Sequence, residues 1–287
     1  MILPSIYTPA QVQHALDELD RLEHQRSSGP ASQGGRNNFE GFNTRRIYAL
    51  ADKSRAFDCF PIHETVMKLN DYFLQPNYLL TSYHTVNIEP GSVVQLMHTD
   101  DGLVALPRPR PLMGIVSSIA SSVSRFSKIL ANESIQGTMI SLDEFTETNG
   151  ATTLIPGSHL WGDDRMPKRE EMIPAVMPSG SMLYFLNTVW HSGGANTSNQ
   201  QRRSLTAQYC QPWIRTYENM TVAMGWEDLD QVPKKLLQLM GFSTHAFMGY
   251  VDGRAPRTGV EMRKKRLIEW ALNERKKEER KERLSRL

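Results

Sequence analysis

The sequence predicts a mainly β fold with flanking helices. Several short runs support this prediction because they have the length of strands, are rich in apolar and β-branched residues, and are bounded by turn-forming residues; the clearest are residues 79–88, 138–145 and 181–190. The chain has 287 residues, of which 39% are hydrophobic and 22% are charged. A chain of this length and composition can bury the core of one β-rich domain.

Helical patterns lie before and after these strand-like runs. The first helix is predicted to begin at Thr8-Pro9, because threonine is a favoured N-cap and proline fits the first turn. Its apolar residues recur at helical spacing, at Val12, Leu16, Leu19 and Leu22. A second helix is predicted over residues 57–74, and a third over residues 232–240. We expect the first two to pack on the outside of the β core.

The connecting segments are marked by their composition. Residues 27–38 are rich in Gly, Ser, Asn and Gln, which predicts a mobile loop. Residues 106–111 alternate proline and arginine, and so many prolines are incompatible with a central strand. Residues 117–132 are rich in serine and have a weak amphipathic helical pattern. We interpret this last segment as a lid or a dimer contact.

The stretch from Gln95 to Asp101 holds the first candidate metal ligands. We interpret it as part of a strand, in which residues two apart point to the same face. The imidazole of His98 and the carboxylate of Asp100 then leave the backbone side by side. On a regular strand Gln95 faces away from them, unless a bulge turns it inward. Asp101 replaces Asp100 only if the register shifts by one residue.

Such a pair supplies two ligands of a facial triad, the arrangement of two histidines and one carboxylate that binds non-haem Fe(II). A lone His-x-Asp pair is common, so a second histidine is required. Of the eight histidines, His191 is the best candidate because it closes an apolar strand and opens the turn-rich run 191–198. His159 is the main competitor, but it follows Pro-Gly-Ser in what we interpret as a structural turn.

Arg202 and Arg203 begin the next strand-like run. A guanidinium group pairs bidentately with a carboxylate, as the binding of an acidic co-substrate such as 2-oxoglutarate requires. Alternation along a strand allows only one of the two arginines to face inward. The residue types alone leave the choice between them open.

Taken together, these motifs resemble those of a known enzyme family. The motifs are His98-Thr-Asp100, the run 149–159, and the run 190–196 followed by Arg202. In this order they are similar to the phytanoyl-CoA dioxygenase family of Fe(II)- and 2-oxoglutarate-dependent oxygenases. The combination is far more specific than any one of the motifs.

The resemblance covers roughly residues 7–217 and implies a fold and a site. The implied fold is a double-stranded β-helix, the jelly-roll core of cupin-like proteins. The implied iron ligands are His98, Asp100 and His191. The resemblance also implies that the arginine eleven residues beyond His191, which is Arg202, binds the distal carboxylate of 2-oxoglutarate.

Three further residues are candidates for contacting the co-substrate on the same resemblance. Relatives use a glutamine close to the position of Gln95, a hydroxyl on the strand of Thr138, and an arginine from the run that contains Arg46. Two alternatives remain from the residues themselves. Thr138 also fits as an ordinary β-former, and Arg46 also fits as a solvated charge beside an apolar strand.

The implied reaction is an oxidation that uses Fe(II), 2-oxoglutarate and O2, with ascorbate as a reductant. The carboxylate of Asp100 implies hydroxylation, desaturation, rearrangement or endoperoxidation, since halogenating relatives lack this carboxylate. We expect a mostly apolar small molecule, a secondary-metabolite intermediate, as the substrate, because the basic residues do not gather into a coenzyme A cradle. The alternatives are a phytanoyl-CoA-like acyl-thioester hydroxylase and a catalytically silent jelly-roll binding protein.

Partners and location are bounded by composition. No run approaches the roughly 18 apolar residues of a membrane helix, and two cysteines are too few for a disulfide framework. We therefore expect a cytoplasmic protein without a membrane partner. We divide the chain into an oxygenase domain, residues 1–260, and a charged helical tail, residues 261–287. The tail is basic but lacks interleaved aromatic residues, so we expect no nucleic-acid partner. Whether the chain forms a homodimer stays open.

Overall fold

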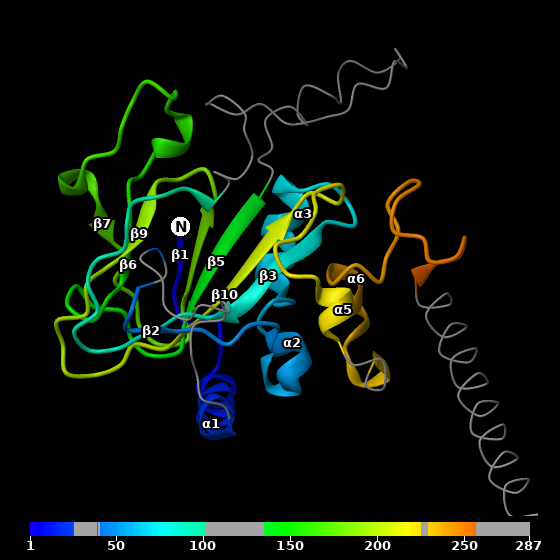
Figure 1. The fold of residues 1–287 in the computed structure, drawn as a ribbon, viewed down its shortest axis with the longest axis horizontal. Helices are drawn as coiled ribbons and strands as arrows, with labels where there is room; N and C mark the ends of the chain where they lie inside the picture. The colour runs from blue at the N-terminus through cyan, green and yellow to red at the C-terminus, as the bar shows by residue number, and fades with distance from the viewer. Residues whose placement is uncertain (26–38, 40, 101–134, 225–228, 257–287) are drawn as a thin grey trace, which may run out of the picture.

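A five-stranded antiparallel sheet is the largest element of the protein, as the computed structural model shows (Figure 1). The structure describes residues 1–25, 39, 41–100, 135–224 and 229–256. In spatial order the strands are β1 (Ile2–Leu3), β8 (Met182–Leu186), β5 (Ile135–Ser141), β10 (Ser204–Cys210) and β3 (Leu79–Thr85). Strand β10 pairs with both β3 and β5, so it lies between the central strand β5 and the edge strand β3.

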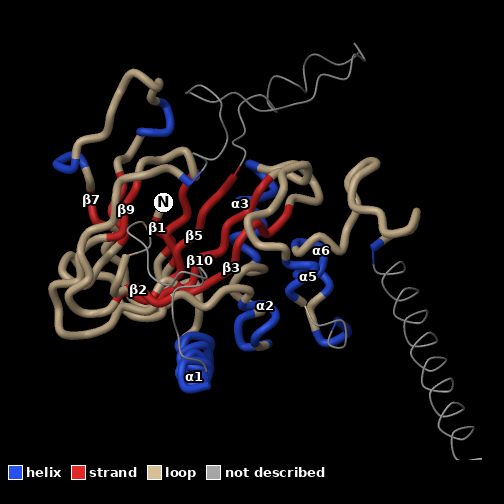
Figure 2. The backbone as a smooth tube through the Cα atoms, in the orientation of Figure 1, coloured by secondary structure: helices blue, strands red, loops and turns tan. Residues whose placement is uncertain are grey.

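Helices cover one face of this sheet. They are α1 (Pro9–Gln25), α2 (Leu50–Lys53), α3 (Glu64–Phe73), α5 (Met220–Ala223) and α6 (Lys234–Leu239), with 3-10 turns η1 (Arg55–Phe57) and η5 (Leu229–Gln231) between them. In the view of Figure 2, α1, α2, α5 and α6 lie below and to the right of the strands. The main core lies between helices and sheet, where Leu19, Phe57 and Leu236 pack with Leu205 and Tyr209 of β10.

The opposite face of the large sheet faces a smaller sheet of three strands. Its strands, in spatial order, are β7 (Ile173–Pro174), β6 (Thr152–Leu154) and β9 (His191–Gly193). A two-residue ladder joins β2 (Thr44–Arg45) to β4 (Asn87–Ile88). The 3-10 turns η3 (Ser158–Leu160) and η4 (Arg169–Glu171) lie between β6 and β7. The prediction of a mainly β fold with flanking helices is confirmed.

The alternation of residues along β10 explains why the sheet has two different faces. Leu205, Ala207 and Tyr209 are buried on the helix side. Thr206 and Gln208, which alternate with them, point to the other side, toward the smaller sheet. A strand places successive side chains on opposite faces, so one strand here contributes both to the main core and to the site.

Two of the three predicted helices are confirmed and one is wrong. The helix predicted from Thr8-Pro9 is confirmed as α1, and the helix predicted over residues 232–240 is confirmed as the shorter α6. The single helix predicted over residues 57–74 is wrong. The chain forms η1 and a turn before α3 begins at Glu64, because Pro61 lacks the N–H of a helix interior. His63 then caps α3, since its Nδ1 accepts a hydrogen bond from the Thr65 N–H.

Several predictions concern residues outside the described part of the chain. These are the loop at 27–38, the proline-rich segment at 106–111, the serine-rich segment at 117–132, the tail at 261–287, and Asp101. Among the described residues, no helix is both long enough and apolar enough to cross a membrane.

Candidate metal centre and its cavity

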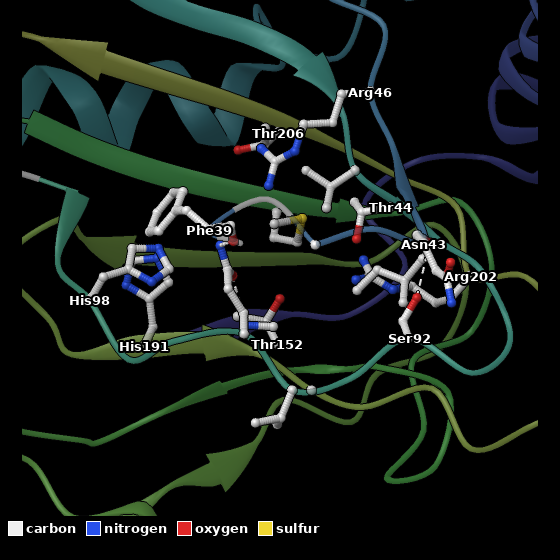
Figure 3. A pocket seen from close by; sticks show the side chains of 18 of the residues that line it. Phe39, Asn43, Thr44, Arg46, Ser92, His98, Thr152, His191, Arg202 and Thr206 are labelled. Carbon is white, nitrogen blue, oxygen red and sulfur yellow. Dashed lines mark hydrogen bonds between the residues drawn. The ribbon is translucent and has the colours of Figure 1, made fainter. Parts of the chain in front are cut away.

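A cavity of about 120 Å³ lies between the two sheets. The large sheet contributes His84, Met139, Thr206 and Gln208 to its wall, and the smaller sheet contributes residues of β6 and β9. Figure 3 shows His98 and His191 side by side at one end of the cavity and Arg202 at the other. The predicted site residues are therefore arranged along the cavity, from a histidine pair to a guanidinium group.

His98, Asp100 and His191 lie together, as predicted. Their candidate ligand atoms all lie within 4.8 Å of one another. The Nε2 atom of His98 is 3.6 Å from Asp100 Oδ1, and the Nε2 atom of His191 is 3.6 Å from Asp100 Oδ2. Two imidazoles and one carboxylate are a donor set for a divalent transition metal such as iron.

The backbone fixes the orientation of both imidazoles. The Nδ1 atom of His98 lies 2.8 Å from the Leu96 carbonyl oxygen, and the Nδ1 atom of His191 lies 2.9 Å from the Val189 carbonyl oxygen. A carbonyl oxygen accepts hydrogen bonds only, so each Nδ1 carries the proton and each Nε2 presents a lone pair. Burial is the main cause that lowers the pKa of His98, and the neighbouring His191 is the second. The lowered pKa favours the neutral imidazole, which is the form that binds metals.

The carboxylate of Asp100 is held by residues from the second half of the chain. Gln208 Nε2 donates a hydrogen bond of 2.8 Å to Asp100 Oδ2, and the Tyr217 hydroxyl donates one of 2.5 Å to the Asp100 carbonyl oxygen. Burial raises the pKa of Asp100, while the nearby His98 and Arg46 oppose this effect. A bound cation would compensate for the cost of burying this charge.

The segment that carries His98 is not the regular strand that we predicted. His98 and His191 exchange two backbone hydrogen bonds of 2.9 Å, and Gln95 N–H donates to the Gly193 carbonyl oxygen. The three-residue separation of Gln95 and His98 thus pairs with the two-residue separation of His191 and Gly193. One extra residue on one side of a strand pair is a β-bulge. The bulge turns Gln95 inward, so that its side chain lines the cavity with His98. Its amide accepts from Gly193 N–H and donates to the Phe39 carbonyl oxygen.

A close backbone approach keeps β9 in place. A Cβ atom on Gly194 would lie 2.5 Å from the Ala151 carbonyl oxygen, so only glycine fits there. The Gly194 N–H donates to the same oxygen. The turn-rich run after His191 therefore has a structural role, since it anchors the strand that presents this histidine.

Arg202 lies at the far end of the cavity and is 1% exposed. Its Nη1 donates to Ser204 Oγ, its Nη2 donates to the Gly150 carbonyl oxygen, and its guanidinium lies over the Phe145 ring. Its Nε has no hydrogen-bond partner among the described residues. Burial lowers the pKa of Arg202 to about 9. A buried cation with an unused donor is suited to binding a carboxylate.

Arg203 lies on the opposite side. Its Nε and Nη2 each lie 3.0 Å from a carboxylate oxygen of Asp143, and its Nη1 lies 3.4 Å from Asp20 on α1. Arg203 is therefore already bound to two carboxylates outside the cavity. Alternation of the chain separates the two arginines as predicted, and it is Arg202 that faces the cavity.

Arg46 also lines the cavity, with His84 next to it. The two side chains are in contact, since Arg46 Nη1 is 3.1 Å from His84 Nε2. His84 stacks on Tyr48 and lies 2.8 Å from Ser82 Oγ through its Nδ1. Glu218 accepts hydrogen bonds from Ser82 Oγ and from the backbone N–H groups of Ala49 and Tyr83, and so ties these segments together.

Thr138 does not face the cavity, which corrects our expectation. It is completely buried on the helix side of β5, and its hydroxyl donates to the Ala207 carbonyl oxygen and accepts from Ala207 N–H. Met139, one residue later, lines the cavity instead, opposite Thr206 of β10. The strand was predicted, but we placed the wrong face inward.

His84 and Gln208 line this site and were not predicted from the sequence, although a signal for both was present. Ser204, Thr206 and Gln208 are polar and alternate with apolar residues, which marks a polar face of β10. His84 lies on the corresponding face of β3, opposite Thr206. Tyr217, which we expected in the wall of the site, supports Asp100 from an irregular segment and is not among the residues that line the cavity. His159, the competing histidine, lies in η3 and does not line the cavity.

Comparison with known proteins identifies the family. The family model of phytanoyl-CoA dioxygenase (PhyH) matches residues 1–204. Dioxygenase FUM3 of Gibberella moniliformis is 27% identical over 251 residues, which are 84% of this chain and 78% of that protein. Dioxygenase swnH1 of Arthroderma benhamiae is 31% identical over 180 residues, which are 62% of this chain and 54% of that protein.

Solved structures share the fold. HygX from Streptomyces hygroscopicus, with nickel, 2-oxoglutarate and hygromycin B bound, has a TM-score of 0.56 at 14% identity and covers 76% of this chain and 85% of its own. SnoN, a non-haem alpha-ketoglutarate-dependent epimerase from nogalamycin biosynthesis, has a TM-score of 0.53 at 20% identity. The match covers 74% of this chain and 77% of SnoN. The expected jelly-roll core is thereby confirmed. The chain belongs to the phytanoyl-CoA dioxygenase family of Fe(II)- and 2-oxoglutarate-dependent oxygenases.

Proposed function

We propose that the protein binds Fe(II) through His98, Asp100 and His191 and uses 2-oxoglutarate to oxidise a mostly apolar small molecule. One observation carries the proposal. Three converging ligand groups lie at one end of a cavity, and a buried guanidinium with an unused N–H lies at the other. 2-Oxoglutarate has a keto acid group that chelates a metal and a distal carboxylate that needs a cation, so its two ends match the two ends of the cavity.

Arg202 is the proposed anchor of the distal carboxylate. The buried guanidinium of Arg202 donates to two neutral oxygens, Ser204 Oγ and the Gly150 carbonyl oxygen, and a carboxylate in a bidentate pair would best offset the cost of burying its charge. The free Nε and the low pKa of Arg202 support this assignment. Arg203 does not fit this role because its guanidinium is already paired with Asp143 and Asp20.

Arg46 and Gln95 are the proposed further contacts of the co-substrate. Both line the same cavity as the histidine pair and Arg202. The guanidinium of Arg46 is steadied by its contact with His84, so it is held ready for an anionic group. The amide of Gln95 is held by Gly193 and Phe39, and this fixes its side chain in the wall.

The chain itself supplies geometry, charge and exclusion of water. Bound Fe(II) and 2-oxoglutarate together supply the activation of O2, with release of succinate and CO2, and ascorbate serves to keep the iron reduced. The imidazoles present fixed lone pairs, Arg202 orients the co-substrate, and the aromatic rings of Phe39 and Phe185 border the histidines. The buried ring of Phe185 shields His191 from bulk water.

The substrate is proposed to be a natural-product intermediate. The cavity mouth carries the exposed apolar side chains of Phe39, Phe42, Val93 and Val94. HygX and SnoN share the fold; the HygX structure holds hygromycin B, and SnoN comes from nogalamycin biosynthesis. An acyl-thioester substrate is the second candidate, but the cationic side chains that line the described cavity are Arg46 and Arg202, too few to bind the phosphates of coenzyme A as well.

We also propose the wider setting of the enzyme. Residues 1–260 are proposed as one oxygenase domain, since β1 at the start of the chain pairs with β8 and Leu236 of α6 packs in the same core as α1. A cytoplasmic location is proposed because Cys59 and Cys210 are both free thiols, as in a reducing compartment.

The experiment is an assay of succinate release. Purified protein with Fe(II), ascorbate and 2-oxoglutarate is expected to release succinate in an uncoupled reaction, and His98→Ala and His191→Ala are expected to abolish it. His159→Ala is the matched control, because His159 lies outside the cavity, and it is expected to leave the rate unchanged. Equal background rates in the wild type and both triad variants would overturn the enzyme proposal and favour a catalytically silent binding protein.

A further inference from the structure

The metal-site carboxylate is held differently from the two histidines. Each imidazole is oriented by a carbonyl oxygen two residues away in its own segment. The carboxylate of Asp100 is oriented from a distance, by the Nε2 of Gln208 on β10. Its main chain is held at both ends, by the Tyr217 hydroxyl on the carbonyl oxygen and by Asn187, whose carbonyl oxygen accepts from Asp100 N–H at 3.0 Å.

Gln208 and Tyr217 lie beyond residue 204, where the family match ends. We propose that Gln208 and Tyr217 are positioning residues that fix which oxygen of Asp100 is offered to the metal. This inference rests on the proposed function, because it takes the metal to lie between His98, Asp100 and His191.

The hydrogen bonds of the carboxylate select one oxygen. Gln208 donates to Oδ2, while the described residues give Oδ1 no hydrogen bond. Each oxygen lies 3.6 Å from an imidazole, Oδ1 from His98 Nε2 and Oδ2 from His191 Nε2, so the hydrogen bond from Gln208 is what distinguishes them. An amide donor that engages one oxygen of a carboxylate favours binding of the metal through the other oxygen. One-oxygen ligation leaves more coordination positions open, and the chemistry of a bidentate co-substrate and O2 needs those positions.

The sheet is built to place Gln208. On one side it pairs with Ser82 of β3, and on the other with Gly137 of β5, which has no side chain to compete for the space. A Cβ on Gly137 would lie 2.4 Å from the Asn187 side-chain oxygen, so any larger residue would displace Asn187. Gln208 is only partly buried, and its amide reaches from the floor of the cavity to Asp100.

A bulge in β3 places Tyr217. The register between β10 and β3 shifts after Gln208, which leaves Thr81 as an extra residue. Thr81 Oγ1 accepts from Tyr217 N–H at 2.9 Å, and the Thr81 carbonyl oxygen accepts from Glu218 N–H at 2.8 Å. The extra residue thus docks the segment that carries Tyr217 and brings its hydroxyl to Asp100.

The test measures metal binding rather than turnover. The variants are Gln208→Met, which keeps the length of the side chain but removes the donor, and Tyr217→Phe, which removes only the hydroxyl. Co(II) is titrated into the metal-free protein, and both the Kd and the visible spectrum of the bound ion are recorded. Gln136→Met is the matched control, because Gln136 is buried in neighbouring β5 and its side chain has no hydrogen-bond partner among the described residues.

Loss of an orienting hydrogen bond to a metal ligand typically weakens metal binding about 10- to 100-fold. We expect the Co(II) Kd of Gln208→Met to rise within this range, with a changed spectrum, and that of Tyr217→Phe to rise by a smaller factor. Gln136→Met is expected to keep the wild-type Kd and spectrum. A merely structural role would lower the melting temperature without changing the spectrum of the bound ion.

The outcomes separate this inference from the proposed function. If His98→Ala binds Co(II) as the wild type does, the triad is not the metal site and both fail. If His98→Ala loses binding while folded Gln208→Met keeps the wild-type Kd and spectrum, the inference alone is overturned. Should Gln208→Met not fold, Tyr217→Phe decides by the same criterion, and a wild-type Kd and spectrum in that variant overturn the inference.

Discussion

Arg202 and Arg203 are neighbours in the sequence and lie in opposite environments. Arg202 is buried at the end of the cavity and retains an unused donor, whereas Arg203 is paired with Asp143 and Asp20 on the α1 side. The difference follows from strand alternation alone. The pair therefore provides a test in which the same substitution is made one residue apart.

Arg202→Met is expected to raise the KM for 2-oxoglutarate about 100-fold, which corresponds to about 3 kcal/mol, because a charge-assisted pair in a buried site is lost. Arg203→Met is expected to leave this KM near the wild-type value and to lower stability slightly, because it leaves Asp143 without its partner. Succinate release as a function of 2-oxoglutarate concentration measures both. The reverse order of effects would place the co-substrate on the other face of the chain.

Asp58 is a buried acid outside the site, and it makes stability depend on pH. It is 6% exposed, its Oδ1 has no hydrogen-bond partner among the described residues, and its Oδ2 is 3.5 Å from Arg55 Nη1. Burial raises the pKa of Asp58 to about 6, and Arg55 only partly opposes this. The folded protein therefore retains a proton that the unfolded chain has lost between about pH 4 and pH 6, so Asp58 costs stability as the pH rises through this window.

Asp58→Asn removes that cost. We expect the variant to be more stable than the wild type at pH 7.5, by on the order of 1 kcal/mol after allowance for solvent screening, and the gain to shrink toward pH 4. Urea unfolding of the metal-free protein at several pH values measures the difference. A gain that is equal at pH 4.5 and pH 7.5, or a loss at pH 7.5, would contradict this assignment.

At the scale of residues, the sequence predicted the site residues that differ in type from the apolar residues of the strands around them. A His-x-Asp pair, a histidine at the end of an apolar strand and a doubled arginine stand out by type and spacing, and the structure brings His98, Asp100 and His191 together. Thr138 and Gln208 do not stand out. Whether such a residue faces the cavity depends on the register between strands, and register is set by distant pairing that a single strand does not encode.

Helix α1 shows what a sequence determines at the scale of elements. Thr8 and Gln11 form a capping box, because Gln11 N–H donates to Thr8 Oγ1 at 3.2 Å and Thr8 N–H donates to Gln11 Oε1 at 2.9 Å. Pro9 occupies the first position, where no intrahelical N–H is needed. The helix then buries Ala15 and Leu19 against the core. Local chemistry and apolar spacing agree here, so the start of the helix was predicted to the residue.

Thr8→Ala is expected to lower the free energy of unfolding by about 1 kcal/mol, because one orphan N–H of the first turn loses its acceptor. Urea unfolding measures this change. Gln13→Ala is the control, since Gln13 is exposed on the same helix and only pairs with Asp17 at the surface. If both variants lose the same free energy, the cap contributes nothing beyond ordinary helix propensity.

Other elements could not be predicted because their form depends on distant partners. The segment from Gln95 to His98 reads as a strand, but its bulge arises from pairing with β9, nearly a hundred residues away. The register shift at Thr81 likewise follows from the pairing of β3 with β10. The break before α3 is different, since Pro61 was visible in the sequence and we gave it too little weight.

At the scale of the molecule, the site is assembled from both sheets and from the segments between them. His191 belongs to β9 of the smaller sheet, Arg202 lies just before β10 of the larger one, and His98 and Asp100 come from the segment that crosses between them. The His98–Asp100 segment, His191 and Arg202 come together only when the core is folded. A ligand that needs several of them together binds only the folded state and must stabilise it.

We expect this stabilisation to appear in two separable increments of the melting temperature. Mn(II), used in air in place of Fe(II), is expected to raise it through the triad, and 2-oxoglutarate added to the Mn(II) form is expected to raise it further. At about 100 times Kd each ligand contributes about 2.7 kcal/mol, or roughly 5–10 °C for a protein of this size. Arg202→Met is expected to keep the first increment and lose the second, and His98→Ala is expected to lose both, because the co-substrate chelates the metal that this variant no longer holds. A second increment that survives in Arg202→Met would mean that the distal carboxylate is bound by another cation, and Arg46, the other arginine that lines the described cavity, would then be the group to replace next.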